Sequence, residues 1–194
     1  MMTELTADAQ DYLASIGITL TDDNTRLYRQ ALTHSSYTYE QKVSSLESYE
    51  RLEFLGDAVL KLIVSQYLFR HYPEYREGDL TKIRAVVVSD QMLSTFCTQI
   101  ELDTHIIMGP SEARQGGRKK VSTLACAFES LLGAMYQDDR WDLLVTLIEG
   151  LLDTCVDTID KSKTKDNFKA ALQEWCQGKS LGLPHYQTVS ESGP

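Results

Sequence analysis

The sequence has no apolar run near the roughly 20 residues that a membrane-spanning helix needs. Its opening, MMTELTADAQDYL, is acidic and lacks the basic segment and apolar run of a secretory signal. The four cysteines, Cys97, Cys126, Cys155 and Cys176, form no CxxC pair, which argues against a zinc knuckle or a disulfide framework. We therefore expect a cytoplasmic protein with no membrane partner.

Positive charge is also scarce. The chain has 19 Lys and Arg against 28 Asp and Glu, a formal net charge of −9. Such a balance argues against a surface that holds polyanions by bulk attraction, so a nucleic-acid partner would need local basic patches or bound metal. Hydrophobic residues make up 42% of the 194 residues, enough for a globular core.

The alternation typical of β-strands is missing until the last dozen residues, and nearly every other segment has helical periodicity. The prediction is an all-α body. Its expected helices cover residues 6–16, 24–37, 49–72, 77–100, 123–137 and 141–159, with Ser122 as the N-cap of the fifth and loops at 38–48 and 114–120.

A charged segment without apolar residues, DKSKTK, indicates a linker near the end of the body. We expect a first domain over residues 1–160, a linker over 161–166 and a fragment of a second domain over 167–194. That fragment is predicted to hold one helix at 167–177 and one strand at 184–190, too little to bury a core alone.

The stretch ERLEFLGDAVL places Glu53 and Asp57 four residues apart, on one face of a helix. Cys126 and Glu129 share a face of the fifth predicted helix, and Gly56 would let the two helices cross closely. Repulsion between such carboxylates could be relieved by a hard divalent metal. The alternative is that they lie on solvated faces, with Asp57 paired to Lys61.

Several motifs together resemble the ribonuclease III family of bacterial type. They are ERLEFLGDAVL, ALTHSSY, REGDLTKIRA, GPSEARQGGRKK and TLACAFESLLGAMYQD. The final run, FKAALQEWCQGKSLGLPHYQTVSESGP, resembles the first helix and first strand of a double-stranded-RNA-binding domain. The resemblance covers essentially the whole chain and implies an all-α ribonuclease III nuclease domain followed by an incomplete α/β RNA-binding domain.

The resemblance implies a Mg²⁺-dependent endoribonuclease, with Mn²⁺ as a substitute and no organic cofactor, that cuts double-stranded RNA as a homodimer. It implies 5′-phosphate and 3′-hydroxyl ends and a role in processing ribosomal and other RNA precursors, messenger RNA included. By position, Glu53, Asp57 and Glu129 match catalytic residues; Glu53, Cys126 and Glu129 match metal ligands; and Glu50, Glu77, Glu112 and Gln173 match positions along the RNA.

One departure concerns the metal site directly. The family has aspartate where this chain has Cys126, and a thiol is a poor ligand for Mg²⁺. The cysteine could be natural, engineered or redox-sensitive, and the sequence does not separate these origins. The alternative function is a non-cleaving dimer that binds double-stranded RNA; a helical scaffold unrelated to RNA is a third hypothesis. Tyr49, where the family has asparagine, is a milder departure.

Two further features have two interpretations each. The cations of RQGGRKK, Arg114, Arg118, Lys119 and Lys120, are candidates for phosphate contacts, or they form a solvated basic loop. Phe54, beside a predicted catalytic carboxylate, is either an interface residue or part of the core.

Overall fold

The structure, a computed structural model, describes residues 4–161, 175–176, 179 and 184, and the side chains of 156–161 are not described. Its helices are α1 (Ala7–Ser15), α2 (Thr25–Ala31), α3 (Ser35–Glu40), η1 (Ser45–Glu47), α4 (Glu50–His71), α5 (Glu77–Val87), α6 (Asp90–Gln99), η2 (Leu102–His105), α7 (Pro110–Arg114), η3 (Gly117–Lys119), α8 (Val121–Gln137) and α9 (Trp141–Lys161).

The fold is all-α, as predicted. Over the described residues the one β contact is an isolated bridge between Thr33 and Ile107. Within the same residues, none of the helices combines the length and apolar character needed to span a membrane. Lys161, where the predicted linker begins, is the last residue of α9, and the rest of that linker lies outside the described residues. Of the predicted helix at 167–177 the structure describes 175–176, which are helical, and of the predicted strand at 184–190 it describes 184; Gln173 lies outside.

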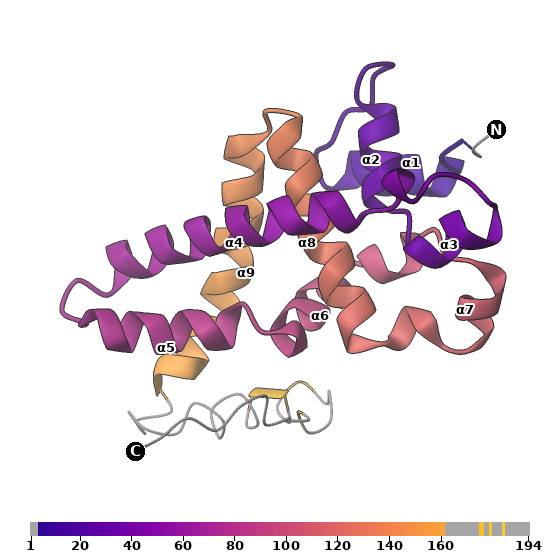
Figure 1. The fold of residues 1–194 in the computed structure, drawn as a ribbon. Coiled ribbons are helices and arrows are strands. Elements are labelled where there is room, and N and C mark those ends of the chain that lie inside the picture. The colour runs from indigo at the N-terminus through magenta and orange to yellow at the C-terminus, as the bar shows by residue number, and fades with distance from the viewer. Residues whose placement is uncertain (1–3, 162–174, 177–178, 180–183, 185–194) are drawn as a thin grey trace.

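Helices α4 and α8 cross at the centre of the molecule (Figure 1). A Cβ atom added at Gly56 would overlap the backbone carbonyl of Glu129, and one added at Gly133 would overlap that of Leu52. Only glycine permits this separation of the two backbones. The expected close crossing of the two helices is therefore confirmed, and it brings Glu53 and Asp57 toward the middle of α8, near Cys126 and Glu129.

Helix α8 is the core of the fold. Eleven of its residues are buried, among them Ala127, Phe128, Leu131 and Met135 with no exposed surface. Helix α6 packs on one side of α8, where the rings of Phe96 and Phe128 lie 5.9 Å apart. A helix that is apolar on most sides can be stable only when other helices surround it.

Two predicted helices are wrong in extent, because each is interrupted. The expected helix at 77–100 ends at Val87, within a run of β-branched residues that favour helices less. A new helix, α6, begins after Ser89, which caps it because its Oγ accepts the N–H of Met92 at 3.4 Å. The expected helix at 24–37 stops at Ala31, because the backbone of Thr33 bonds instead to Tyr49 at 2.8 Å and pairs with Ile107.

Two predicted boundaries also change. Helix α8 begins at Val121 with Lys120 as its N-cap, so the prediction of Ser122 as the cap is wrong. The expected loops at 38–48 and 114–120 contain the end of α3, η1 and η3. Short helical turns of this kind depend on contacts distant in sequence, which local patterns do not report.

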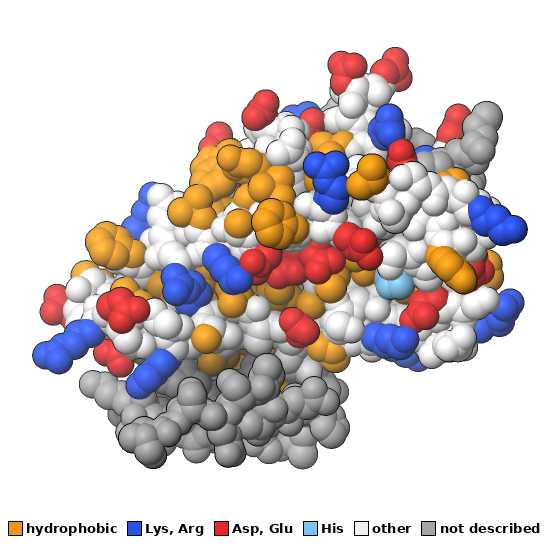
Figure 2. All heavy atoms as spheres, viewed as in Figure 1, with side chains coloured by type: hydrophobic (Ala, Val, Ile, Leu, Met, Phe, Trp, Pro, Cys, Tyr) orange, Lys and Arg blue, Asp and Glu red, His pale blue; other side chains and the backbone are white. Residues whose placement is uncertain are grey.

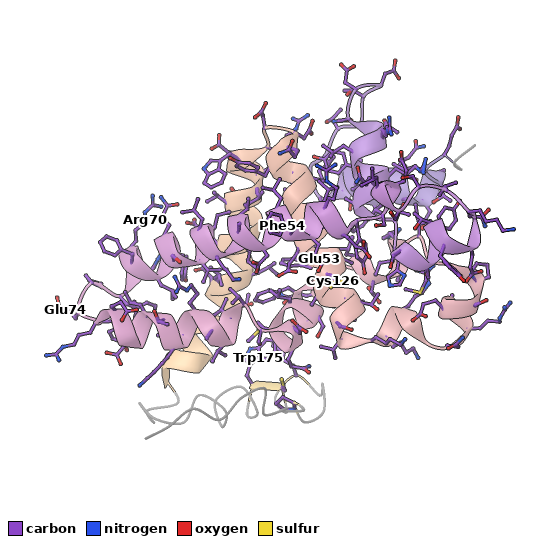
Figure 3. The ribbon with its side chains drawn as sticks, in the orientation of Figure 1. Glu53, Phe54, Arg70, Glu74, Cys126 and Trp175 are labelled. Atoms are coloured by element: carbon purple, nitrogen blue, oxygen red, sulfur yellow. The ribbon has the colours of Figure 1, made fainter. Side chains whose placement is uncertain are left out.

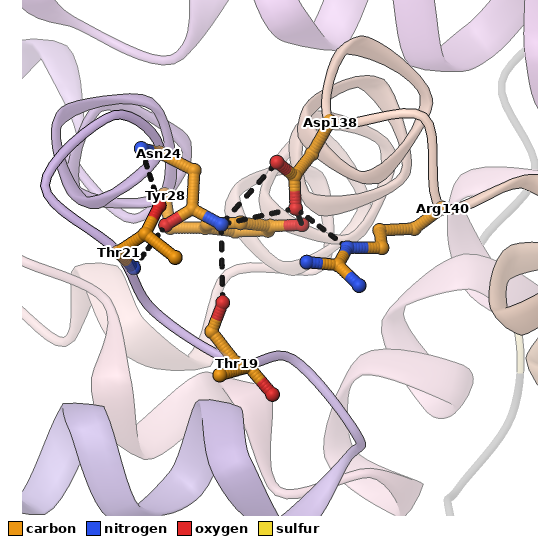
Figure 4. A network of polar contacts seen from close by, with 6 residues as sticks. All are labelled: Thr19, Thr21, Asn24, Tyr28, Asp138 and Arg140. Atoms are coloured by element: carbon orange, nitrogen blue, oxygen red, sulfur yellow. Dashed lines mark hydrogen bonds and ion pairs between the residues drawn. The ribbon is translucent and has the colours of Figure 1, made fainter.

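A buried polar network fastens α2 to the end of α8 (Figure 4). The Asp138 carboxylate accepts hydrogen bonds from the Tyr28 hydroxyl at 2.9 Å and from Arg140 Nε at 2.9 Å. The Asn24 amide also donates to Asp138, at 3.1 and 3.2 Å, and to the carbonyl of Thr19 at 3.1 Å. Both oxygens of this partly buried carboxylate thus have partners, which offsets the cost of removing its charge from water.

Candidate active site

Helix α4 contributes Glu53 and Asp57 to an acidic cluster beside its crossing with α8 (Figures 2 and 3). Glu53 is half-buried, and burial raises the pKa of its carboxyl above the ordinary value. The negative charges of Glu50, Asp90 and Asp57 raise this pKa further, whereas a hydrogen bond with the Cys126 side chain lowers it. Glu53 therefore faces both α8 and other acids.

Helix α8 contributes Glu129. Burial raises the pKa of Glu129 to about 8, and the charges of Asp57 and Glu53 contribute to the increase. Among the described residues, the positive charge of Lys61 acts in the other direction and lowers the pKa of Glu129. Carboxylates from two helices are thus close enough to repel each other and have little compensating positive charge.

Cys126 of α8 lies next to Glu53 of α4 (Figure 3), and the charges of both Glu53 and Glu129 act on it. Burial and the nearby charges of Glu53 and Glu129 raise the pKa of the Cys126 thiol to about 12. Near neutral pH the side chain is therefore a thiol and not a thiolate. It can donate a hydrogen bond to Glu53, but it supplies no negative charge to a cation.

Asp57 has the partner that the alternative interpretation predicted. Lys61 Nζ donates to Asp57 Oδ2 at 2.7 Å, one turn along α4. Both side chains are more than a third exposed, so this ion pair contributes little to stability. The pair uses one carboxylate oxygen of Asp57, and the other remains available.

Asp90 joins this cluster, although the sequence analysis did not select it. Its charge raises the pKa of Glu53, of Cys126 and of Glu129, so it acts on groups from both central helices. Asp90 is exposed and is the first residue of α6. The sequence did carry a signal, because Ser89 followed by Asp90 is a typical helix start; the predicted continuous helix at 77–100 concealed it.

The residues predicted to line the RNA lie at different distances from this cluster. Glu50 acts on Glu53 and also on His34. Glu112 forms an ion pair with Lys120, whose Nζ lies 2.6 Å from Glu112 Oε1, and its charge also acts on His34. Glu77 accepts a hydrogen bond from Thr81 at 2.8 Å in a cavity between α4 and α5, and it shifts the pKa of neither Glu53 nor Glu129.

The basic segment is held in place more than a solvated loop would be. Arg118 Nη1 donates to the backbone carbonyls of Asp103 and Thr104 at 3.4 and 3.5 Å. Arg114 reaches Ser111 Oγ at 3.5 Å, and Lys119 is exposed. Since Lys120 is paired with Glu112, an incoming phosphate would compete with contacts inside the protein at three of the four cations.

An apolar strip runs along the outer side of α4. Phe54 is 82% exposed, and Leu62 and Phe69 on the same helix are 57% and 74% exposed. Figure 2 shows apolar side chains gathered next to the acidic cluster, and Phe54 is labelled in Figure 3. The interpretation of Phe54 as a core residue is therefore wrong.

Residues 24–152 match the family described as Ribonuclease-III-like. Ribonuclease 3 of Pelotomaculum thermopropionicum is 43% identical over 191 residues, which cover 96% of this chain and 78% of that protein. Ribonuclease 3 of Halalkalibacterium halodurans is 41% identical over 177 residues, 91% of this chain and 67% of that protein. The chain belongs to the ribonuclease III family.

Solved structures agree with this assignment. The nuclease domain of ribonuclease III from Campylobacter jejuni superposes with a TM-score of 0.66 at 33% identity, covering 75% of this chain and 96% of that chain. The description of that structure mentions a region involved in dimer formation. The predicted family, fold class and enzyme class are thereby confirmed.

Members of this family generally depend on a divalent metal. Among the described residues, no three His, Cys, Asp or Glu side chains are arranged so that they could hold an ion directly. The oxygen donors of Glu53, Asp57 and Glu129 suit a hard cation that keeps several waters, as Mg²⁺ does. The Cys126 thiol does not suit it.

Proposed function

We propose that this chain hydrolyses phosphodiester bonds in double-stranded RNA at the acidic cluster shared by α4 and α8, with Mg²⁺ or Mn²⁺ as cofactor. The observation that carries the proposal is the crowding of carboxylates from two crossing helices, expressed in the pKa of about 8 at Glu129. Family membership supplies the substrate class. A cluster that repels itself without a cation is suited to binding one.

Glu53 and Glu129 would hold the ion, one from each helix. When bound, a divalent metal supplies charge relief at the phosphoryl oxygens and lowers the pKa of water. The oxygen of Asp57 that Lys61 leaves available would orient the attacking water and accept its proton. Water oxygen then bonds to phosphorus while the bond to the 3′ oxygen breaks. Protonation of that oxygen leaves 5′-phosphate and 3′-hydroxyl ends.

Duplex RNA would be recognised by shape along the same face. Its minor groove is wide and displays 2′-hydroxyls, whereas its base edges are hidden in the deep major groove. We keep Glu50, Glu77, Glu112 and Arg118 as proposed RNA-facing residues; the charge of Glu50 on Glu53 supports its position beside the cluster. Gln173 stays a prediction outside the described residues.

The apolar strip on α4 supports a homodimer as the active form. Exposed aromatic residues beside an active site are costly in water and are typical of protein interfaces. The C. jejuni relative has a region involved in dimer formation. Two copies would place two carboxylate clusters on one duplex, one for each strand. Cytoplasmic processing of ribosomal and messenger RNA precursors is part of the same proposal.

A single set of assays tests the activity. Purified chain is incubated with a long RNA duplex, with the same strands unpaired, and with Mg²⁺, Mn²⁺ or chelator. The proposal expects metal-dependent internal cuts in the duplex alone and loss of cutting in Glu129→Gln. A chain that binds the duplex yet cuts it under none of these conditions would support the non-cleaving alternative, which the neutral thiol of Cys126 favours.

A further inference from the structure

The ring of His34 is held in one tautomer by its neighbours. The backbone N–H of Ser36 donates to His34 Nδ1 at 3.0 Å, so this nitrogen carries no proton. The Ser36 hydroxyl lies 2.8 Å from the same nitrogen and accepts the N–H of Gly109 at 3.0 Å. Because burial lowers the pKa of His34, the ring is neutral near pH 7 and its single proton is on Nε2.

His34 Nε2 has no hydrogen-bond partner within the part of the chain that the structure describes. It is also not one of the buried polar atoms that lack a partner there, which are Tyr12 Oη, Arg29 Nη2 and Trp175 Nε1. The Nε2–H group is therefore a donor that no described residue uses and that is not completely buried, whereas Nδ1 on the opposite side of the ring already has partners.

His34 is held by a backbone hydrogen bond and by a ring contact with Tyr49, a residue on which the charges of Glu53 and Glu50 act. Its own N–H donates to the carbonyl of Ile107 at 2.9 Å, and its ring packs edge-on against Tyr49 with centroids 5.5 Å apart. Tyr49 immediately precedes α4, two turns from Asp57. The charges that act on the ring are those of Glu112, Lys120 and Glu50. The proposed function assigns Glu112 and Glu50 to the RNA-facing side.

The charges around His34 decide which RNA group it would bind. Glu112 is neutralised by Lys120, whereas Glu50 has no ion pair among the described residues. A phosphate next to Glu50 would be repelled. A ribose hydroxyl is neutral and both accepts and donates, so it can accept from Nε2–H and donate to a carboxylate.

We propose that His34 contacts RNA directly, with Nε2–H donating to a ribose 2′-hydroxyl in the minor groove. This inference rests on the proposed function and adds a substrate contact that distinguishes RNA from DNA. His34 takes no part in the chemical step. Nδ1 of His34 caps α3, whereas Nε2 would bind the substrate.

The two tasks can be separated by two substitutions. Asparagine places an acceptor near the position of Nδ1 and no donor at Nε2, so His34→Asn should keep the melting temperature and lose the contact. Glutamine reaches the Nε2 position but leaves α3 uncapped, so His34→Gln should melt earlier and keep the contact. His71→Asn is the matched control, because that histidine contacts the Tyr67 carbonyl at the far end of α4.

All three variants are made in the 194-residue chain carrying Glu129→Gln. Duplex affinity is measured by fluorescence anisotropy. His34→Asn should weaken binding of an RNA duplex about fivefold, the size of one neutral hydrogen bond, while the other two stay within twofold. On 2′-fluoro duplexes, which keep the A-form helix without the hydroxyl, His34→Asn should have no effect.

Three results would overturn the inference: unchanged affinity in His34→Asn, an equal loss on the 2′-fluoro duplex, or a shallower salt dependence that indicates a phosphate contact. If His34→Gln fails to fold, His34→Asn alone decides. Cleavage of the same duplex by the unsubstituted chain in Mg²⁺ is measured in parallel, so loss of the proposed function would be seen separately.

Discussion

Replacing Cys126 by aspartate should strengthen metal binding. With a thiol pKa of about 12, holding Cys126 as a thiolate at pH 7 would cost about 7 kcal/mol. Because this cost opposes ligation, we expect Cys126 to stay a thiol outside the ligand shell of Mg²⁺. A carboxylate at this position supplies negative charge at a much lower cost. We therefore expect the Cys126→Asp variant to bind Mn²⁺ at least about tenfold more tightly than the unsubstituted chain, which is the low end of the affinity changes seen when residues near a metal are replaced.

The matched control is Cys126→Ser, which keeps the size and the hydrogen bond to Glu53 but adds no charge. Free Mn²⁺ is measured by electron paramagnetic resonance, and duplex cleavage is followed against Mg²⁺ concentration. Cys126→Asp should also melt earlier in chelator, because another acid joins the cluster, and recover when metal is added. Equal Mn²⁺ affinity in the aspartate and serine variants would refute the reasoning.

Three further results are expected. Gly56→Ala should destabilise the fold by about 2 kcal/mol in denaturant titrations, because the added methyl group overlaps the Glu129 carbonyl. Gly150→Ala is the control and should stabilise the fold, because a methyl group there meets open space on α9. Equal effects of the two substitutions would contradict the close crossing. The pKa of Glu129 is about 8 in the folded chain, raised from a value near 4.3 in the unfolded chain. The contribution of this group to the free energy of unfolding is therefore fully present at pH values below the unfolded-chain pKa, and it is lost as the pH rises through the folded-chain pKa. Metal-free Glu129→Gln should therefore melt later than the unsubstituted chain at pH 8 and not at pH 4. Phe54→Glu should yield monomers in sedimentation experiments while Tyr39→Glu, equally exposed on α3, should not.

The sequence was sufficient for the parts of the site that lie inside long helices. The periodicity of ERLEFLGDAVL predicted α4 to within a residue at each end, and the four-residue spacing predicted both the shared face of Glu53 and Asp57 and the Asp57–Lys61 pair. Gly56 indicated the close crossing with α8, which the overlap at the Glu129 carbonyl confirms.

The parts that failed depend on contacts distant in sequence. The break before His34 arises where Thr33 pairs with Tyr49 and Ile107, and no local pattern announces it. Apolar periodicity continued through Ser89, so the prediction missed the new helix and with it Asp90. Tertiary hydrogen bonds and caps override a continuous apolar pattern at such places.

The most direct test of the shared carboxylate site is a crystal of this protein soaked in Mn²⁺ and measured for anomalous scattering. The account predicts a peak between Glu53 on α4 and Glu129 on α8, with Cys126 Sγ outside its ligand shell. Absence of that peak at saturating Mn²⁺ would contradict a shared carboxylate site. So would a Mn²⁺ ion bound elsewhere, if Glu53→Gln and Glu129→Gln both left the Mn²⁺ affinity unchanged.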